Sequence, residues 1–317
     1  MRRMGADMIS SVTLVHNQAM NLGRILSAYA AQSLVPKVFV FVLDRCTDDS
    51  YDMILRFSEK FNVKILETDH GSGFMAGFNR DVGLAYLKEA HPLTSVLFLD
   101  GDCVPTHDLF CVVNKTLECG EARVALISRK LETEAGAVID DYRIVSPWSK
   151  NKIFVSGINN IVTSMYLARQ RQLTWSGSLG LNMTAVDAVV DVVSRITGEA
   201  RLFSSAFDGV WGGEDDFIGL VAMFYSINVC AVDPSNYVQH IYHTSKCDES
   251  FSDNGRVQYE KLRLLAIKDQ APGLYNAAID IEKIYIDDML KAVALLREGN
   301  IQQGEEIFQL NKQLQRT

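Results

Sequence analysis

The stretch "VLFLDGDCVP", residues 96–105, decides the fold and raises the question of what the protein does. Four apolar residues run directly into Asp100 and Asp102, which are separated by a single glycine. On a strand, side chains two residues apart project from the same face. The two carboxylates are therefore expected to lie close together, where they repel each other unless a cation or protons neutralise them.

Predicted strands and helices alternate over the first hundred residues. The strands are nearly continuous apolar runs, and the helices carry apolar residues at helical spacing. This alternation predicts an α/β fold with a mainly parallel sheet covered by helices on both faces. Ligands of such sheets bind at the carboxyl ends of the strands, where Asp44 and Asp100 fall. The predicted strands are 8–15, 37–44, 62–68 and 94–100, and the helices are 21–32, 51–61 and 78–90.

The rest of the chain continues this pattern less regularly. A further strand is predicted over 123–131, and helices over 185–196 and 215–227. Beyond residue 250 the sequence changes to charged helical segments. We therefore expect one α/β domain over 1–250 and a helical C-terminal extension over 251–317, with packing or homo-oligomer formation as the role of the extension.

Composition and charge restrict the classes of function. The 317 residues carry a net charge of −8, so the overall field does not favour non-specific binding to nucleic acid. The longest apolar stretch, 218–232, is interrupted by polar residues and is too short to span a bilayer. No signal peptide is evident, and the six cysteines form no CxxC pair, which is typical of reduced thiols in a cytoplasmic protein.

The pair of aspartates around Gly101 has three interpretations. A calcium loop of the EF-hand type needs an oxygen ligand at its twelfth position, but that position is Cys111. Solvated turn acids are the simplest alternative. The third is a site for Mg²⁺ or Mn²⁺, which prefer oxygen ligands and often bind one or two carboxylates together with substrate phosphates. Gly101 would then let those phosphates approach the backbone closely.

A second acidic cluster lies in "WGGEDDF", residues 211–217, where three consecutive acids open a very apolar helix. Acids suit the start of a helix because of its dipole. One acid is enough for this purpose, however, and three adjacent carboxylates repel one another. A catalytic base at the mouth of a pocket explains the cluster better.

The segment "HIYH" places His240 and His243 after a predicted strand. A zinc site would need further cysteine or histidine ligands at recognisable spacing, and none is evident. One histidine that completes a metal shell of carboxylate and phosphate is the more economical interpretation.

In this order, the segments resemble the GT-A-fold glycosyltransferases, especially those of family 2, over roughly residues 8–245. The resemblance rests on "FVFVLDRCTDDS" (39–50), "GFNRDVGLAYLK" (77–88), the DxD-like "FLDGDCVP" (98–105), "WSGSLGLNMTA" (175–185) and the galactosyltransferase-like "WGGEDDF". Two departures are Asp81 in place of an asparagine, and Arg45-Cys46 in place of the usual acidic residue and glycine.

The resemblance implies a nucleoside-diphosphate-sugar donor, with a UDP-sugar as the leading candidate. It also implies a Mn²⁺ or Mg²⁺ ion. It implies that Asp215 is the general base, that Glu214 holds the acceptor, and that the anomeric carbon is inverted. The residues assigned to the donor are Asp44, Arg80, Asp100 and His16. Those assigned to the metal are Asp102, Asp100 and His243, with His240 as the rival histidine. Those assigned to the acceptor are Trp211, Gly213, Asp216 and Trp175.

Two other classes of function stay open. One is a non-catalytic nucleotide-sugar-binding protein of the same fold, and the other is a metal-dependent nucleotidyltransferase, whose chemistry also uses paired aspartates. The acceptor is not readable from the sequence. A glycan, a protein side chain or a modified nucleobase stays possible, with a glycan as the leading candidate, and the net charge of −8 ranks nucleic acid below a glycan.

Overall fold

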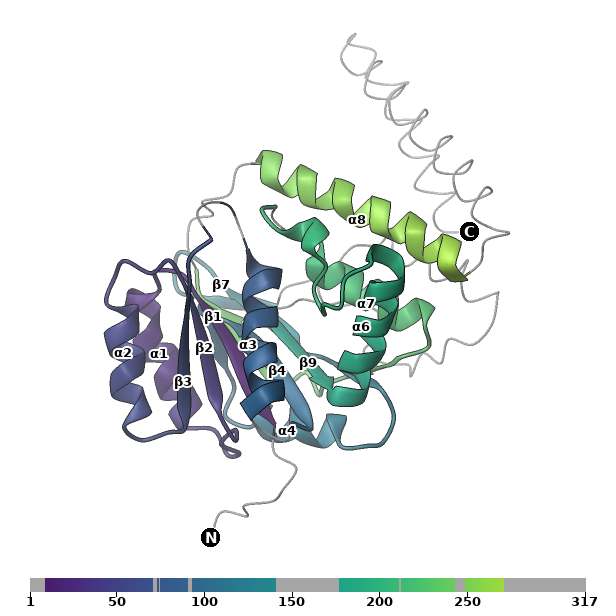
Figure 1. Cartoon of the computed structure of the whole chain (residues 1–317). Helices are drawn as coiled ribbons and strands as arrows, with labels where there is room; N and C mark the ends of the chain where they lie inside the picture. Colours follow the sequence, from purple (N-terminus) through teal and green to yellow (C-terminus); the bar gives the residue numbers. More distant parts are fainter. Residues whose placement is uncertain are drawn as a thin grey trace, which may run out of the picture.

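The structure, a computed structural model, describes residues 9–70, 73, 75–90, 93–140, 177–210, 212–242 and 249–270. Figure 1 shows a twisted central sheet with helices on both faces. The sheet has seven strands in the order β10-β6-β9-β4-β1-β2-β3. Its strands are β1 (Ser10–Val15), β2 (Phe39–Asp44), β3 (Val63–Thr68), β4 (Ser95–Asp100), β6 (Arg123–Leu126), β9 (Ser178–Asn182) and β10 (Asn228–Ala231). All neighbouring strands are parallel except β9, which is antiparallel to β4 and β6.

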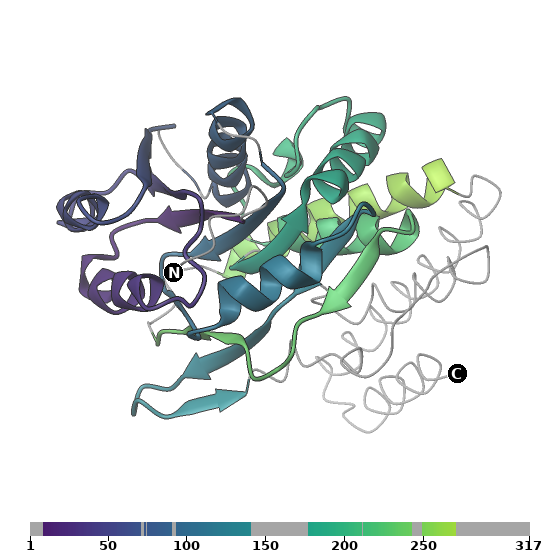
Figure 2. The ribbon, with the colours of Figure 1, turned by 90° about the horizontal axis from the view of Figure 1, so that it is seen from below.

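The helices cover the sheet in two layers. They are α1 (Ala19–Ala30), α2 (Ser50–Ser58), α3 (Ala76–Ala90), α4 (Leu109–Leu117), α6 (Met183–Thr197), α7 (Glu214–Phe224) and α8 (Glu249–Gln270), with a short 3₁₀ turn at Ser205–Phe207. A second, four-stranded sheet has the order β5-β11-β7-β8. Its strands are β5 (Cys103–Pro105), β7 (Ser128–Glu132), β8 (Val138–Asp140) and β11 (Tyr237–His240), and it lies at lower left in Figure 2.

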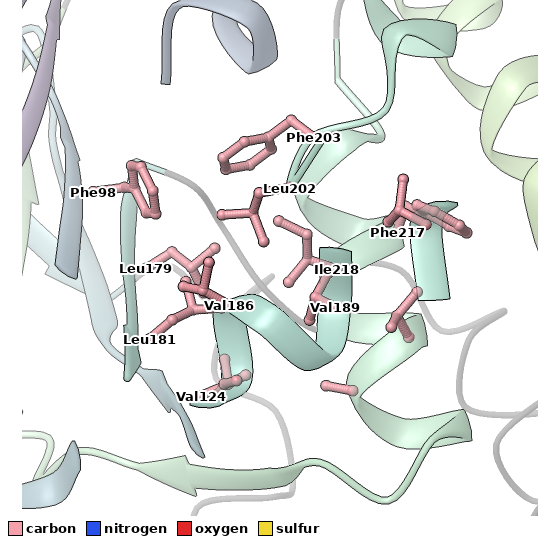
Figure 3. Packing of buried hydrophobic residues seen from close by; sticks show 14 of the residues in the cluster. Phe98, Val124, Leu179, Leu181, Val186, Val189, Leu202, Phe203, Phe217 and Ile218 are labelled. Atoms are coloured by element: carbon pink, nitrogen blue, oxygen red, sulfur yellow. The ribbon is translucent and has the colours of Figure 1, made fainter. Parts of the chain in front are cut away.

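Both faces of the main sheet are buried because successive strand residues point to opposite sides. In β2, Phe39 and Phe41 belong to the hydrophobic core that includes α1, α2 and α4, whereas Val40 and Val42 belong to the core on the opposite face. Figure 3 shows this second core, in which Phe98, Leu179 and Leu181 of the sheet face α6, α7 and the segment around Phe203. The predicted mainly parallel, mixed α/β architecture is confirmed.

One strand prediction needs correction. The stretch 123–131 is not one strand, because it divides at the buried Ile127 into β6 of the main sheet and β7 of the small sheet. Both halves favour extended structure, so their composition does not reveal a change of sheet. The segment 175–185, one of the segments that carry the resemblance, forms in its described part the buried strand β9 between β4 and β6, followed by the start of α6.

Helix α8 packs into the main core, although its sequence lies within the predicted extension. Tyr259, Leu262, Ala266 and Ile267 are buried in the same cluster as α6 and α7. Residues 271–317 lie outside the described part of the chain, so the oligomerising role of the extension stays a prediction. Among the described residues, no helix combines the length and apolar character needed to cross a membrane.

Asp81, one of the two departures from the expected pattern, joins α3 to the segment that leads into α7. Its carboxylate accepts hydrogen bonds from Arg201 Nε at 3.0 Å and from the backbone N–H groups of Leu202 and Phe203. Arg201 also donates to Asp208 at 2.7 Å. Burial raises the pKa of Asp81 to about 6, against the opposing effect of Arg201. Asp81 therefore holds the approach to α7 in place.

We expect Asp81→Ala to lower the free energy of unfolding by about 2–4 kcal/mol, because it removes the acceptor of a partly buried arginine and of two backbone N–H groups. Urea unfolding monitored by circular dichroism measures this loss. The control is Asp187→Ala, whose side chain is 71% exposed in an ion pair with Lys88, and which should change stability by less than about 0.5 kcal/mol. Equal effects of the two substitutions would contradict the role of Asp81.

Candidate active site

The two aspartates of the opening stretch lie at the carboxyl edge of the main sheet. Strand β4 ends at Asp100, and β5 of the small sheet begins directly after Asp102. A Cβ atom added to Gly101 would lie 2.5 Å from the carbonyl oxygen of Leu14 and 3.3 Å from Cα of Val15. The close approach of the end of β1 by itself requires glycine here, independently of the approach of phosphates that the metal-site interpretation predicts.

The small sheet brings a histidine to Asp102. Strand β11 runs antiparallel to β5 with His240 opposite Cys103, and the N–H of Ile241 donates to the Asp102 carbonyl at 2.9 Å. His240 Nε2 consequently lies 3.5 Å from Asp102 Oδ2, while Cys103 Sγ donates to Asp102 Oδ1 at 3.2 Å. His240 is the rival of His243 among the predicted metal ligands. The first choice, His243, lies outside the described residues.

The chemistry of this pair fits a divalent ion. Carboxylate oxygen suits Mg²⁺ and Mn²⁺, and an imidazole nitrogen is a common ligand of transition metals. Within the described ranges, no group of three or more His, Cys, Asp or Glu residues is arranged to hold a metal ion by itself. The pair therefore fits an ion whose remaining ligands come from phosphate oxygens and water, rather than a closed structural site.

Arg80 connects this edge to the second acidic cluster. It is only 3% exposed, and it donates to Asp100 Oδ1 at 2.7 Å and to Glu214 Oε1 at 3.0 Å. Its guanidinium also lies 5.6 Å from the centre of the Phe203 ring. Burial by itself would lower the pKa of Arg80, but the negative charges of Asp100 and Glu214 outweigh burial and raise it. One buried cation thus holds β4 and the start of α7 together.

Glu214 is placed differently from the expectation. The sequence resemblance implies that it holds the acceptor, but the residue is 5% exposed and its carboxylate binds Arg80. Burial and the neighbouring charge of Asp215 raise the pKa of Glu214 to about 7, against the effect of Arg80. Burial also raises the pKa of Asp100, with Asp102 adding to this effect and Arg80 opposing it. The buried Glu214 carboxylate therefore helps to hold the Arg80 side chain in place.

The other two acids of the cluster are partly exposed. Helix α7 starts after Gly213, whose φ of 97° lies in the left-handed region. A Cβ there would lie 2.8 Å from Phe207 Cε1, so the turn requires glycine. The Asp216 N–H donates to Asp215 Oδ1 at 2.9 Å, and both side chains are less buried than Glu214. Trp211 and Trp175, predicted to contact the acceptor, lie outside the described residues.

A further polar group surrounds Asp44 at the end of β2. His16 Nδ1 lies 2.6 Å from the Asp44 carbonyl oxygen, so two of the four residues assigned to the donor from the sequence come together. Arg45 donates to the Asp44 carboxylate, and His70 Nε2 lies 3.6 Å from Asp44 Oδ1. Neither Arg45 nor His70 has a role that is predicted from the sequence. Two features of the sequence could have indicated this polar group. One is the unusual basic residue after Asp44, and the other is a histidine two residues beyond the third strand.

Comparisons with known proteins agree with this architecture. No protein-family model matches the chain, and no curated protein matches it by sequence. Among solved structures, S. aureus TarS 1–349 in complex with UDP-GlcNAc superposes with a TM-score of 0.59 at 18% identity, over 83% of this chain and 67% of that one. GalNAc-T7 with UDP, GalNAc and Mn²⁺ superposes with a TM-score of 0.54 at 14% identity, over 82% of this chain and 48% of that one.

The chain has the GT-A fold. It spans about two thirds of the TarS fragment and less than half of GalNAc-T7, and at these identities the likeness concerns the fold alone.

The raised pKa of Glu214 predicts a dependence of stability on pH. Because the folded protein holds this proton more tightly than the unfolded chain does, the free energy of unfolding should fall as pH rises from about 4.5 to about 7, by up to a few kcal/mol. Glu214→Gln should flatten this fall in metal-free buffer, measured by urea unfolding at several pH values.

The matched control is Glu132→Gln, since the hydrogen bond from Arg24 lowers the pKa of Glu132. That variant should keep the slope of the parent between the same pH values. A Glu214→Gln protein with the same pH dependence as the parent would show that Glu214 titrates normally.

Proposed function

We propose that this protein is a metal-dependent, inverting glycosyltransferase that moves a sugar from a UDP-sugar to an acceptor hydroxyl. The observation that carries the proposal is the bridge by Arg80, which brings the aspartates at the end of β4 and the acids at the start of α7 to one edge of the sheet. A leaving-group site and a catalytic base are the two parts that glycosyl transfer needs close together.

Asp102 and His240 are the residues that would hold the divalent ion, with Asp100 beside them. When bound, the ion stabilises the negative charge that gathers on the departing nucleoside diphosphate, without any proton transfer. Cys103 donates to Asp102 Oδ1, and β11 carries His240 toward Oδ2 of the same carboxylate. These contacts fix the orientation of the carboxylate that would hold the ion.

Asp215 is the proposed general base. It takes the proton of the acceptor hydroxyl while that oxygen forms a bond to C1 of the sugar and the bond from C1 to the diphosphate oxygen breaks. One such displacement inverts the anomeric carbon. Asp215 is partly exposed, whereas its neighbour Glu214 is buried against Arg80. Glu214 therefore positions Arg80 and the start of α7, while Gly213, Asp216, Trp211 and Trp175 are left to the acceptor side.

The choice of UDP is supported by the contents of the similar structures. TarS was solved with UDP-GlcNAc and with UDP, and GalNAc-T7 with UDP and Mn²⁺. The similarity of "WGGEDDF" to the galactosyltransferase element supports a base in this segment. For the acceptor, we propose a glycan, and the net charge of −8 makes a nucleic acid less favourable than a glycan.

Asp102→Asn should leave the protein folded but lower the rate of UDP release from a UDP-sugar in the presence of Mn²⁺ by at least about 100-fold, the scale of losing one strong electrostatic contact. The control is Asp52→Asn, at an exposed position in the first turn of α2, which should keep the parental rate. Equal rates for Asp102→Asn and the parent would remove the metal site from the proposal.

Asp215→Asn should abolish transfer while the affinities for Mn²⁺ and UDP stay at parental values, because the substitution removes a proton acceptor and no metal ligand. Product analysis accompanies the rate measurement. Free nucleoside diphosphate supports glycosyl transfer, whereas pyrophosphate would point to nucleotidyl transfer. Full transfer by the variant would show that the base is another residue.

A further inference from the structure

Strand β11 carries His240 to Asp102, and its position depends on the small sheet. In the described part of the chain, the small sheet and the main sheet form separate hydrogen-bonded ladders. β11 lies between β7 and β5, which begins directly after Asp102. The distance of 3.5 Å from His240 Nε2 to Asp102 Oδ2 therefore depends on how β7 and β11 are held against the rest of the domain.

Glu132, the last residue of β7, joins three elements through its carboxylate. Arg24 of α1 donates from Nη1 to Oε1 at 3.2 Å and from Nη2 to Oε2 at 2.7 Å. Gln239 of β11 donates from Nε2 to Oε2 at 2.5 Å. One carboxylate thus ties both β7 and β11 to α1, a helix whose apolar side belongs to the same hydrophobic core as the main sheet.

The geometry of this contact differs from that of an ordinary surface ion pair. Exposed pairs contribute little because water competes for both charges and two long side chains must be ordered. Here Arg24 makes a two-point contact, the Glu132 side chain is 15% exposed, and Gln239 adds a third hydrogen bond. The hydrogen bond from Arg24 also lowers the pKa of Glu132, so the carboxylate is ionised at neutral pH.

The carboxylate meets β11 at the residue directly before His240. In the register of β11 against β7, Gln239 pairs with Lys130 and His240 pairs with Leu131, the neighbour of Glu132. Successive side chains of a strand point to opposite faces. A contact that holds the Gln239 side chain on one face therefore fixes the backbone from which His240 projects on the other.

We propose that Glu132 is a positioning residue of the metal site, which holds β11 so that the His240 imidazole stays beside Asp102. The inference rests on the proposed function. Groups that support metal ligands from outside affect metal affinity because a ligand that is free to move loses entropy when it binds the ion. Neither Glu132 nor Gln239 contacts the ion in this proposal, and both act on it only through His240.

The test measures the affinity of the full chain for Mn²⁺ at saturating UDP, with free Mn²⁺ detected by electron paramagnetic resonance. Glu132→Ala should lower this affinity about three- to tenfold, less than the roughly 10- to 100-fold typical of partners that contact a metal ligand directly. In a His240→Ala background, the same substitution should change the affinity by less than about twofold, because the residue through which Glu132 acts is absent.

Gln239→Met removes only the link to β11. It should act like Glu132→Ala, and it takes the place of that variant should Glu132→Ala fail to fold. The control is Asp187→Ala, which removes an ion pair that also joins two elements, α3 and α6, through Lys88. This control should keep the parental Mn²⁺ affinity. Should His240→Ala bind no measurable Mn²⁺, the nitrogen coupling of bound Mn²⁺ in pulsed electron paramagnetic resonance replaces the comparison, and it should be weaker in Glu132→Ala than in the parent.

Parental Mn²⁺ affinity in both Glu132→Ala and Gln239→Met would overturn the inference. An equal loss in the parent and His240→Ala backgrounds, or an unchanged nitrogen coupling, would do the same, and in each case the proposed function stands. Unchanged affinity of His240→Ala itself would remove His240 from the metal and the inference with it. A parent that binds no Mn²⁺ in the presence of UDP would overturn the metal dependence of the proposed function as well.

Discussion

The buried guanidinium of Arg80 is the constraint on which the rest of the site depends. A charge this deeply buried is tolerated only when it is paired, and its partners are carboxylates from two separate elements, Asp100 of β4 and Glu214 of α7. Removing either partner would leave Arg80 with a single carboxylate and would leave one of its buried N–H groups without that acceptor. The bridge therefore fixes how α7 meets the sheet edge, and it turns two acidic clusters that are far apart in the sequence into one site.

This site contains more negative charge than Arg80 neutralises. Burial raises the pKa values of both Asp100 and Glu214, and in each case a neighbouring carboxylate adds to the effect although Arg80 opposes it. Burial and like-charge repulsion disfavour the ionised carboxylates, and protons or a further cation would offset both effects. A divalent ion beside Asp102 would supply that charge, and a bound diphosphate would in turn be attracted by the ion. The excess negative charge of the site and the proposed chemistry thus both favour a cation beside Asp102.

Much of the fold is predictable from the sequence because it depends on local patterns. Apolar strands that alternate with amphipathic helices gave the sheet and placed Asp44 and Asp100 at its carboxyl edge. The arrangement inside the site was less accessible. His240 reaches Asp102 through the register of β11 against β5, and Glu214 turns inward because α7 starts at that residue. Both depend on contacts between distant segments, as does the division of 123–131 between two sheets. No local pattern records such contacts.

The most direct test of the account is a crystal structure of the protein with UDP and Mn²⁺, in which anomalous scattering locates the manganese. The account predicts a manganese peak within coordination distance of Asp102 and His240, bridged to the diphosphate, with Arg80 still joining Asp100 to Glu214. A nucleotide bound without manganese at this edge, or a manganese peak held by other residues, would contradict it.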